Sequence, residues 1–264
     1  MSYSSFKKIT LKTPKLKSPK IDIKNYLAHI PKEKTHLESE SLLDHIRLVN
    51  NTAIKLIKVQ NLEFLIDGLI VDFCKQIDFS DKIMTGNFLK EIFISTIVFH
   101  DYGKINENFQ SEKMQNPYFE TKPSSIGSQH SILSAYLFLN YYFKKATKQF
   151  ERQKEQIKVA RIICAFSDSI LKHHSSVIDL KEIDNPDISS ELKEYLHFVG
   201  IKTPFKKIET ILRTKKDFQE KIYSNNNLKN YPLYTLIKLN FSLLTASDYL
   251  ATLSYHNNIN LPEA

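Results

Sequence analysis

The chain has 264 residues, 42% of them hydrophobic, which is enough for one sizeable core or two small ones. Lys and Arg outnumber Asp and Glu by 37 to 29, a net charge of +8 that suits either a polyanionic partner or a lysine-rich solvated surface. No apolar run approaches a membrane span, and no signal peptide is recognisable. Cys74 and Cys164 lie in apolar segments, so we expect reduced thiols and a cytoplasmic setting rather than a disulfide framework.

Residues 1–24 form a basic N-terminal extension, in which seven lysines face one acidic residue, Asp22. Pro14 and Pro19 interrupt any helix there. We expect a flexible or surface-draped extension, with a phosphate-attracting arm as the alternative. Residues 25–264 are expected to form one domain.

The rest of the chain predicts an all-α bundle, because long apolar-periodic segments alternate with short polar breaks and only five glycines occur. One segment, 88–99, is apolar nearly all round and is expected to be central and buried. A polar stretch over 144–158 and a mixed basic region over 175–232 separate the later helices. The predicted helices span 41–59, 61–76, 88–99, 128–139, a segment ending near His174, and 233–255, with a long loop or short-helix region over 106–128.

Polar side chains capable of binding metals interrupt the apolar faces of five of these segments. They are His45, the pair His100–Asp101, His130, the pair His173–His174, and Asp248. A single histidine on an apolar face is usually a satisfied core residue, and a buried carboxylate needs a cation nearby. Convergence on a buried metal cluster explains all seven together, and seven ligands suffice for two ions that share a carboxylate.

The predicted ligand set contains five imidazoles, which favour Mn, Fe, Co, Ni or Zn and make Mg a less suitable ion. The remaining histidines lie in polar or loop contexts that indicate no ligand role. They are His29, His36, His197 and His256, of which His36 and His197 are expected to be exposed.

The stretch HDYGK at residues 100–104 resembles the signature of the HD metal-dependent phosphohydrolase superfamily. That superfamily carries a His, a His-Asp pair and a distant Asp on helices, matched here by His45, His100, Asp101 and Asp248. The segments HDYGKINENFQ, GSQHSILSA, ILKHHSS and TASDYLA are similar, in that order, to the HD nuclease domain of the CRISPR-associated type I interference nuclease-helicases. The resemblance covers about 44–251.

The resemblance implies the role of each residue. His45, His100, Asp101 and Asp248 would hold one metal; Asp101, His130, His173 and His174 would hold the other. Asp101 would bridge the ions as the central catalytic residue, and Lys104 would meet a substrate phosphate or orient a ligand. Ser131 and Ser134 would support the ligands from behind.

The resemblance also implies a metal-dependent endonuclease or exonuclease that hydrolyses single-stranded DNA in antiviral defence. Its partners would be the crRNA-guided surveillance complex and a superfamily 2 helicase, either as a separate chain or as a missing C-terminal domain, since no GxxxxGK[ST] phosphate loop occurs here. Two alternatives stay open: an HD-family phosphohydrolase acting on nucleotides or cyclic nucleotides, and a non-enzymatic nucleic-acid-binding or adaptor module with structural histidines.

Overall fold

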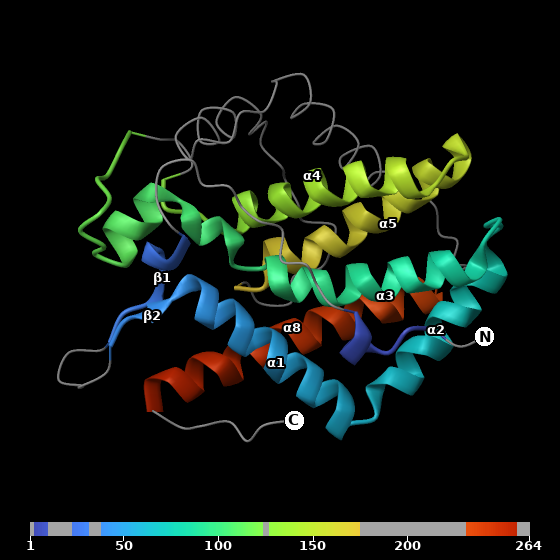
Figure 1. Cartoon of the computed structure of the whole chain (residues 1–264), viewed down its shortest axis with the longest axis horizontal. Coiled ribbons are helices and arrows are strands. Elements are labelled where there is room, and N and C mark those ends of the chain that lie inside the picture. Colours follow the sequence, from blue (N-terminus) through green and yellow to red (C-terminus); the bar gives the residue numbers. More distant parts are fainter. Residues whose placement is uncertain (1–2, 10–22, 32–37, 124–126, 175–230, 258–264) are drawn as a thin grey trace.

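The computed structural model describes residues 3–9, 23–31, 38–123, 127–174 and 231–257. Over these residues the protein is predominantly helical, as the sequence predicts (Figure 1). The mixed basic region lies almost wholly outside the described residues. The α-helices are α1 (Leu42–Val59), α2 (Leu62–Gln76), α3 (Lys82–Phe99), α4 (Ser131–Gln149), α5 (Gln153–Lys172) and α8 (Tyr231–Asn257).

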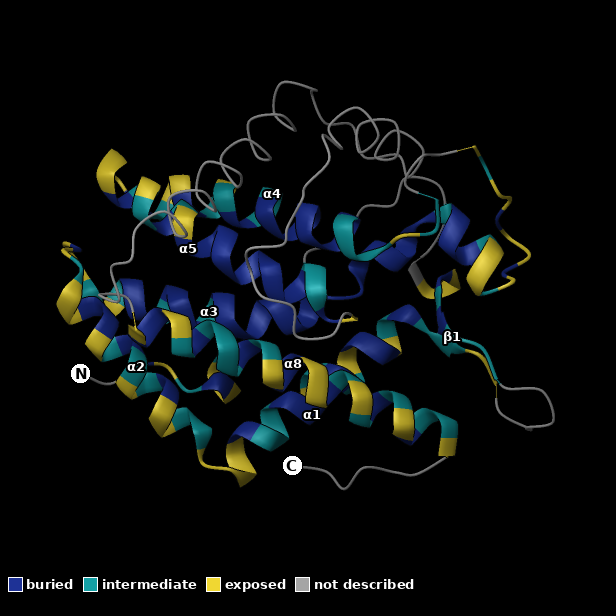
Figure 2. Ribbon diagram, turned by 180° about the vertical axis from the view of Figure 1, so that it is seen from behind, coloured by how far each residue is buried: buried dark blue, intermediate teal, exposed yellow. Residues whose placement is uncertain are grey.

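Helix α3 is the centre of the bundle, as its nearly uniform apolar sequence predicts. It contacts α1, α2, α4, α5 and α8, and almost every residue from Thr85 to Phe99 is buried (Figure 2). The helix begins at Lys82 rather than at Phe88, because the Asp81 side chain accepts a hydrogen bond from the Met84 N–H and caps an earlier turn. Burial on all sides holds the C-terminal end of α3, where His100 follows, in a fixed position.

Helices α1 and α8 pack against each other and against α3. The Ser41 side chain caps α1 by accepting from the Asp44 N–H, and an apolar stripe from Leu42 to Ile57 turns into the core. Asn240 fixes α8 to α3, because its amide accepts from the Thr96 hydroxyl and donates to the Phe93 carbonyl. This packing brings His45 of α1 and Asp248 of α8 to the same end of α3.

Helices α4 and α5 form an antiparallel pair on the other side of α3 (Figure 1). The polar stretch over 144–158 is not the interruption that the sequence suggests. Helix α4 continues to Gln149 and α5 begins at Gln153, so only residues 150–152 are non-helical. Phe150 within this short turn is buried against Phe88 and Phe79.

The beginning of the chain is part of the core, which corrects the expectation that all of residues 1–24 are a separate extension. Tyr3 and Phe6 are buried, and the Phe6 N–H donates to Glu63 Oε1 of α2. Phe6 also lies under the buried ammonium of Lys90, which pairs with Glu63 and Asp67. Residues 10–22, with most of the lysines, lie outside the described residues.

A two-stranded antiparallel hairpin, for which the sequence pattern gives no prediction, lies beside the start of α1. Strands β1 (Leu27–His29) and β2 (Glu40–Ser41) pair His29 with Glu40. Buried Gln110 bonds both the N–H and the carbonyl of Leu27, so the hairpin is fastened to the loop after α3. The region 106–128, for which the sequence predicts a long loop or short helices, contains a turn of π-helix, Phe109–Lys113.

None of the helices in the described part of the chain combines the length and the apolar character that crossing a membrane requires.

Candidate metal centre

All seven residues that the sequence proposes as ligands come together at one place. The first group contains His45, His100, Asp101 and Asp248, and the second contains Asp101, His130, His173 and His174. Within each group the nearest nitrogen and carboxylate oxygen atoms all lie within 4.8 Å of one another. Asp101 belongs to both groups.

The groups assemble because several helices begin or end at this point. His100 follows the last residue of α3, His173 follows the last residue of α5, and His130 precedes the first residue of α4. Asp101 immediately precedes a 3-10 turn, Tyr102–Ile105. His45 lies in the first turns of α1, and Asp248 alone comes from the interior of a helix. The backbone of the bundle therefore fixes the spacing of the side chains.

The first group is buried and contains both carboxylates. His45 Nε2 lies 3.3 Å from Asp101 Oδ2 and 3.3 Å from Asp248 Oδ1. His100 Nε2 lies 3.4 Å and 3.6 Å from the same two oxygens. His45, His100 and Asp101 are fully buried, whereas 17% of the surface of the Asp248 side chain is exposed to solvent. The group therefore meets solvent only at Asp248.

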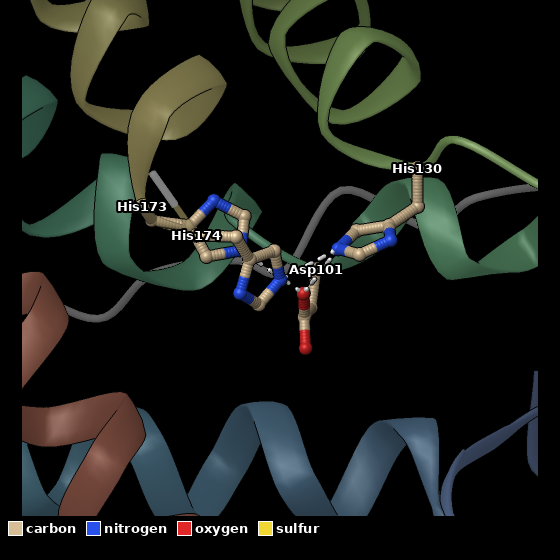
Figure 3. Close-up of side chains that lie close together, drawn as sticks. All are labelled: Asp101, His130, His173 and His174. Carbon is tan, nitrogen blue, oxygen red and sulfur yellow. Dashed lines mark hydrogen bonds and ion pairs between the residues drawn. The ribbon is translucent and has the colours of Figure 1, made fainter. Parts of the chain in front are cut away.

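The second group lies on the opposite side of Asp101 and uses its other oxygen. His130 Nε2 is 3.3 Å from Asp101 Oδ1, and His173 Nε2 is 3.5 Å from it. Figure 3 shows His130 on one side of Asp101 and the two consecutive histidines on the other. His130 Nε2 and His174 Nε2 lie 3.0 Å apart. Because His174 is exposed, this group is the more open of the two.

The polar atoms that face inward lack hydrogen bonds, and this is the test of whether a cation fits. Oδ1 of Asp101 and the Nε2 atoms of His45, His100 and His173 are buried without an aligned hydrogen bond, whereas Oδ2 of Asp101 also lies 2.7 Å from the Lys104 ammonium. Buried polar groups are nearly always satisfied in folded proteins, because leaving one unpaired costs about 1–3 kcal/mol. Imidazole nitrogen and carboxylate oxygen are also the donors that transition metals use. The residues present therefore fit one or more metal ions.

The electrostatics of the first group attract positive charge. Burial disfavours charged imidazoles, but the neighbouring carboxylates overcome this and raise the pKa of His45 to about 10 and that of His100 to about 9. Burial also opposes ionisation of Asp101 and Asp248, yet the surrounding histidines, together with Lys104 for Asp101, hold both pKa values well below their usual range.

The second group differs in its protonation. Burial lowers the pKa of His130, and burial together with the charge of His173 lowers the pKa of His174 to about 3. These two imidazoles are therefore neutral at physiological pH, which is the form that coordinates a metal.

Lys104 is directed into the protein rather than towards solvent. Its ammonium lies 2.7 Å from Asp101 Oδ2 and donates to the Ala28 carbonyl of strand β1 at 3.3 Å, and the residue is only 5% exposed. Of the two roles that the sequence suggests, orientation of a ligand is the one that the contacts support.

Gly103 allows the close approach of α3 and α4. A Cβ atom at this residue would lie 1.8 Å from the His130 carbonyl oxygen, so no other residue fits without displacing α4. The Gly103 N–H donates to the buried Ser134 hydroxyl at 2.7 Å. Ser134 therefore supports the backbone next to the ligands, while Ser131 is partly buried in the first turn of α4.

Two residues beside the centre were missed or dismissed from the sequence. His29 and Glu40 of the hairpin face His45 of α1, and the three residues form a further group of potential ligands. The polar context of His29 in the sequence indicates no ligand role, and Glu40 has no periodic signal because its strand is two residues long. His256 lies near His29, whereas His36 and His197 lie outside the described residues.

Three aromatic residues lie near the ligands in the sequence: Tyr102, Phe109 and Tyr249. Tyr102 and Phe109 are buried, and Phe109 packs edge-on against the His130 ring, so both belong to the packing around the centre. Tyr249, next to Asp248, is 66% exposed.

Fold and site together define a helical protein with a buried histidine–aspartate cluster able to hold metal ions. A scan of protein-family models and searches of curated proteins and solved structures returned no match to this chain.

Proposed function

We propose that this protein is a metal-dependent phosphodiester hydrolase that holds two divalent transition-metal ions. The observation that carries the proposal is the position of Asp101, whose two carboxylate oxygens face separate groups of histidines. A carboxylate shared in this way is the usual link between two ions in hydrolytic centres. The order of the ligands along the chain, with its likeness to HD nuclease domains, supports the same proposal.

The two ions would be held by the first and second groups as defined above, with Asp101 common to both. When bound, such a pair supplies positive charge to a phosphodiester and lowers the pKa of a water molecule. Mn, Fe, Co, Ni or Zn suit the five imidazoles better than Mg does.

The chain's own residues would orient the ligands and restrict access. Lys104 holds Oδ2 of Asp101, and the backbone carbonyls of Ile97 and Ile170 hold the rings of His100 and His173. The buried side of the centre excludes water. An anionic substrate would approach where His174 and Asp248 reach solvent, and the positive charge of Lys104 behind Asp101 favours a phosphate there.

Single-stranded DNA is the substrate that we propose, within CRISPR type I interference in the cytoplasm. The +8 net charge suits a nucleic acid, and a flexible strand enters a recessed site more easily than a stiff duplex. The surveillance complex and a superfamily 2 helicase would be the partners, as the likeness to the nuclease-helicases implies.

The test is cleavage of circular single-stranded DNA after removal of metals and reconstitution with each candidate ion. We expect His100→Ala and Asp101→Ala to lose cleavage completely. Asp72→Ala is the control, because Asp72 is an exposed residue of α2 that pairs only with Lys75 among the ion pairs described.

Two results would contradict the proposal. Turnover of nucleotides or cyclic nucleotides, with DNA left intact, would make the protein a small-molecule phosphohydrolase. A protein that takes up no transition metal under any condition would assign the histidines a structural role.

A further inference from the structure

Two buried histidines of the centre are oriented by the helices that carry them. His100 Nδ1 lies 2.6 Å from the Ile97 carbonyl oxygen, and His173 Nδ1 lies 2.6 Å from the Ile170 carbonyl oxygen. In each case the acceptor is three residues earlier. A proton on Nδ1 satisfies this contact and leaves the lone pair of Nε2 free to face Asp101.

This arrangement depends on the position of each residue at a helix C-terminus. The last four carbonyls of an α-helix have no intrahelical N–H partner, so they can accept from a side chain. His100 and His173 each follow the last residue of a helix and meet such a carbonyl.

His45 cannot donate to a free carbonyl of its own helix in the same way. It lies in the first turns of α1, where each carbonyl already accepts from an N–H four residues ahead. The His45 ring has no exposed surface, and the contact of its Nδ1 atom with the Glu40 carboxylate at 3.2 Å is not aligned as a hydrogen bond. A buried imidazole N–H without an acceptor is costly, so another group must supply one.

Glu40 is placed to do so. Its Oε2 atom lies 3.2 Å from His45 Nδ1 and 2.7 Å from His29 Nδ1, and its side chain is only 9% exposed. The same oxygen faces both rings.

The hairpin holds this carboxylate in place from several directions. His29 lies opposite Glu40 in the strand pair, and the Tyr255 ring of α8 stacks on His29. Gln110 fastens Leu27, and Lys104 donates to the Ala28 carbonyl. A two-residue strand would otherwise be too short to fix a side chain.

We propose that Glu40 is a positioning residue for the first metal group. It accepts the Nδ1 proton of His45, which fixes the tautomer with its Nε2 lone pair directed at the ion, while His29 donates to the same carboxylate from the other side. Carboxylates that orient metal-binding histidines in this way also increase the basicity of the ligand. The inference rests on the metal-binding part of the proposed function.

The first test measures metal affinity in Glu40→Ala and Glu40→Gln by calorimetric titration with Co²⁺ and by the visible spectrum of the bound ion. We expect Glu40→Ala to weaken the first-group ion by about 10–100-fold, the usual effect of losing such a partner. Glu40→Gln keeps an acceptor oxygen of nearly the same shape and should recover part of the loss. The second-group ion should change less, and Asp72→Ala should change neither.

The second test needs no metal. In ¹⁵N-histidine-labelled protein, we expect a solvent-protected Nδ1–H signal from His45 that survives in Glu40→Gln and is lost in Glu40→Ala. Thermal unfolding of each variant shows whether a lost signal reflects a lost fold, and Glu40→Gln, being isosteric, supplies the decisive comparison if Glu40→Ala is unfolded.

Unchanged affinity in a folded Glu40→Ala protein that keeps the signal would overturn the inference. A third bound ion in the wild type that disappears in Glu40→Ala and His29→Gln would also overturn it, because Glu40 would then be a ligand. Absence of any bound metal in the wild type would refute the proposed function, whereas the Nδ1–H signal would still decide whether Glu40 holds His45.

Discussion

Asp101 is the residue on which both groups of ligands depend. Its oxygens divide between them: Oδ2 lies near His45 and His100, and Oδ1 lies near His130 and His173. Asp248, by contrast, contacts only the first group. This asymmetry separates the expected effects of removing each carboxylate.

We therefore expect Asp101→Asn to abolish binding of both ions and Asp248→Asn to abolish only the first. The amide cannot supply a negative charge to either group, whereas without Asp248 the second group keeps all of its ligands. Elemental analysis of each purified variant after dialysis against Mn²⁺ or Co²⁺ gives the number of ions per chain. Retention of one full equivalent by Asp101→Asn would show that this carboxylate does not bridge.

At the scale of elements, the centre depends on how closely the helix ends approach. Gly103 brings the turn after α3 against the first residues of α4, and His130 lies at that contact. Space, not an unusual backbone angle, is the reason for glycine here, since Gly103 is not among the residues of positive φ.

We predict that Gly103→Ala displaces His130 and costs about 1–3 kcal/mol of unfolding free energy, a typical cost of overpacking. We expect the Gly103→Ala protein to lose the metal ion of the second group and to keep the metal ion of the first group. Gly68→Ala is the matched control, because nothing lies within 4 Å of the added Cβ in α2, and its greater helix propensity should add about 0.8–1 kcal/mol. Urea unfolding and metal analysis measure both effects; a Gly103→Ala protein with full second-group occupancy would contradict this account.

The helices and the seven proposed ligands could be predicted from the sequence, because helices and polar residues on apolar faces both appear as local periodicity. A polar residue on an apolar stripe is visible without knowledge of the fold, and each of the seven lies at the centre. The early start of α3, the hairpin and Glu40 could not be read in this way. They depend on Asp81 as a cap and on contacts such as Gln110 to Leu27, which join residues 83 apart in the chain.

At the scale of the whole molecule, Tyr3 and Phe6 near the beginning of the chain complete the core of the bundle. The Tyr3 ring occupies the space beside Gly86 in α3, where an added Cβ would lie 2.1 Å from Tyr3 Cε1. Lys90, Glu63 and Phe6 extend this contact to α2.

We expect Gly86→Ala to displace Tyr3 and to expose the N-terminal segment to proteolysis, with a net loss of about 1–2 kcal/mol. In a Tyr3→Ala background the same change should instead stabilise the protein by roughly 0.5–1 kcal/mol, because only its effect on helix propensity remains. The four proteins of this double-mutant cycle are compared by urea unfolding. Equal effects of Gly86→Ala in both backgrounds would refute the packing of Tyr3.

The stability of chelator-treated protein should also depend on pH in a defined direction. His45 and His100 have pKa values raised from 6.5 to about 10 and about 9, so their contribution is complete below about pH 6.5 and is lost as the pH rises through 9 and 10. Asp101 and Asp248 have lowered pKa values, and their contribution is lost only in strong acid. Urea unfolding should therefore show lower stability at pH 9.5 than at pH 6, and saturating metal should remove much of this difference. A flat profile between these pH values would contradict the ion pairing.

The junction of helix ends has a consequence for the electric field around the centre. Aligned peptide dipoles give an α-helix about half a negative charge at its C-terminus and about half a positive charge at its N-terminus. Helices α3 and α5 both direct their negative ends here, beside His100 and His173, whereas α4 directs its positive end here through His130. The backbone thus favours cations beside His100 and His173 and anions beside His130, so the same three helices that position the ligands also polarise the site.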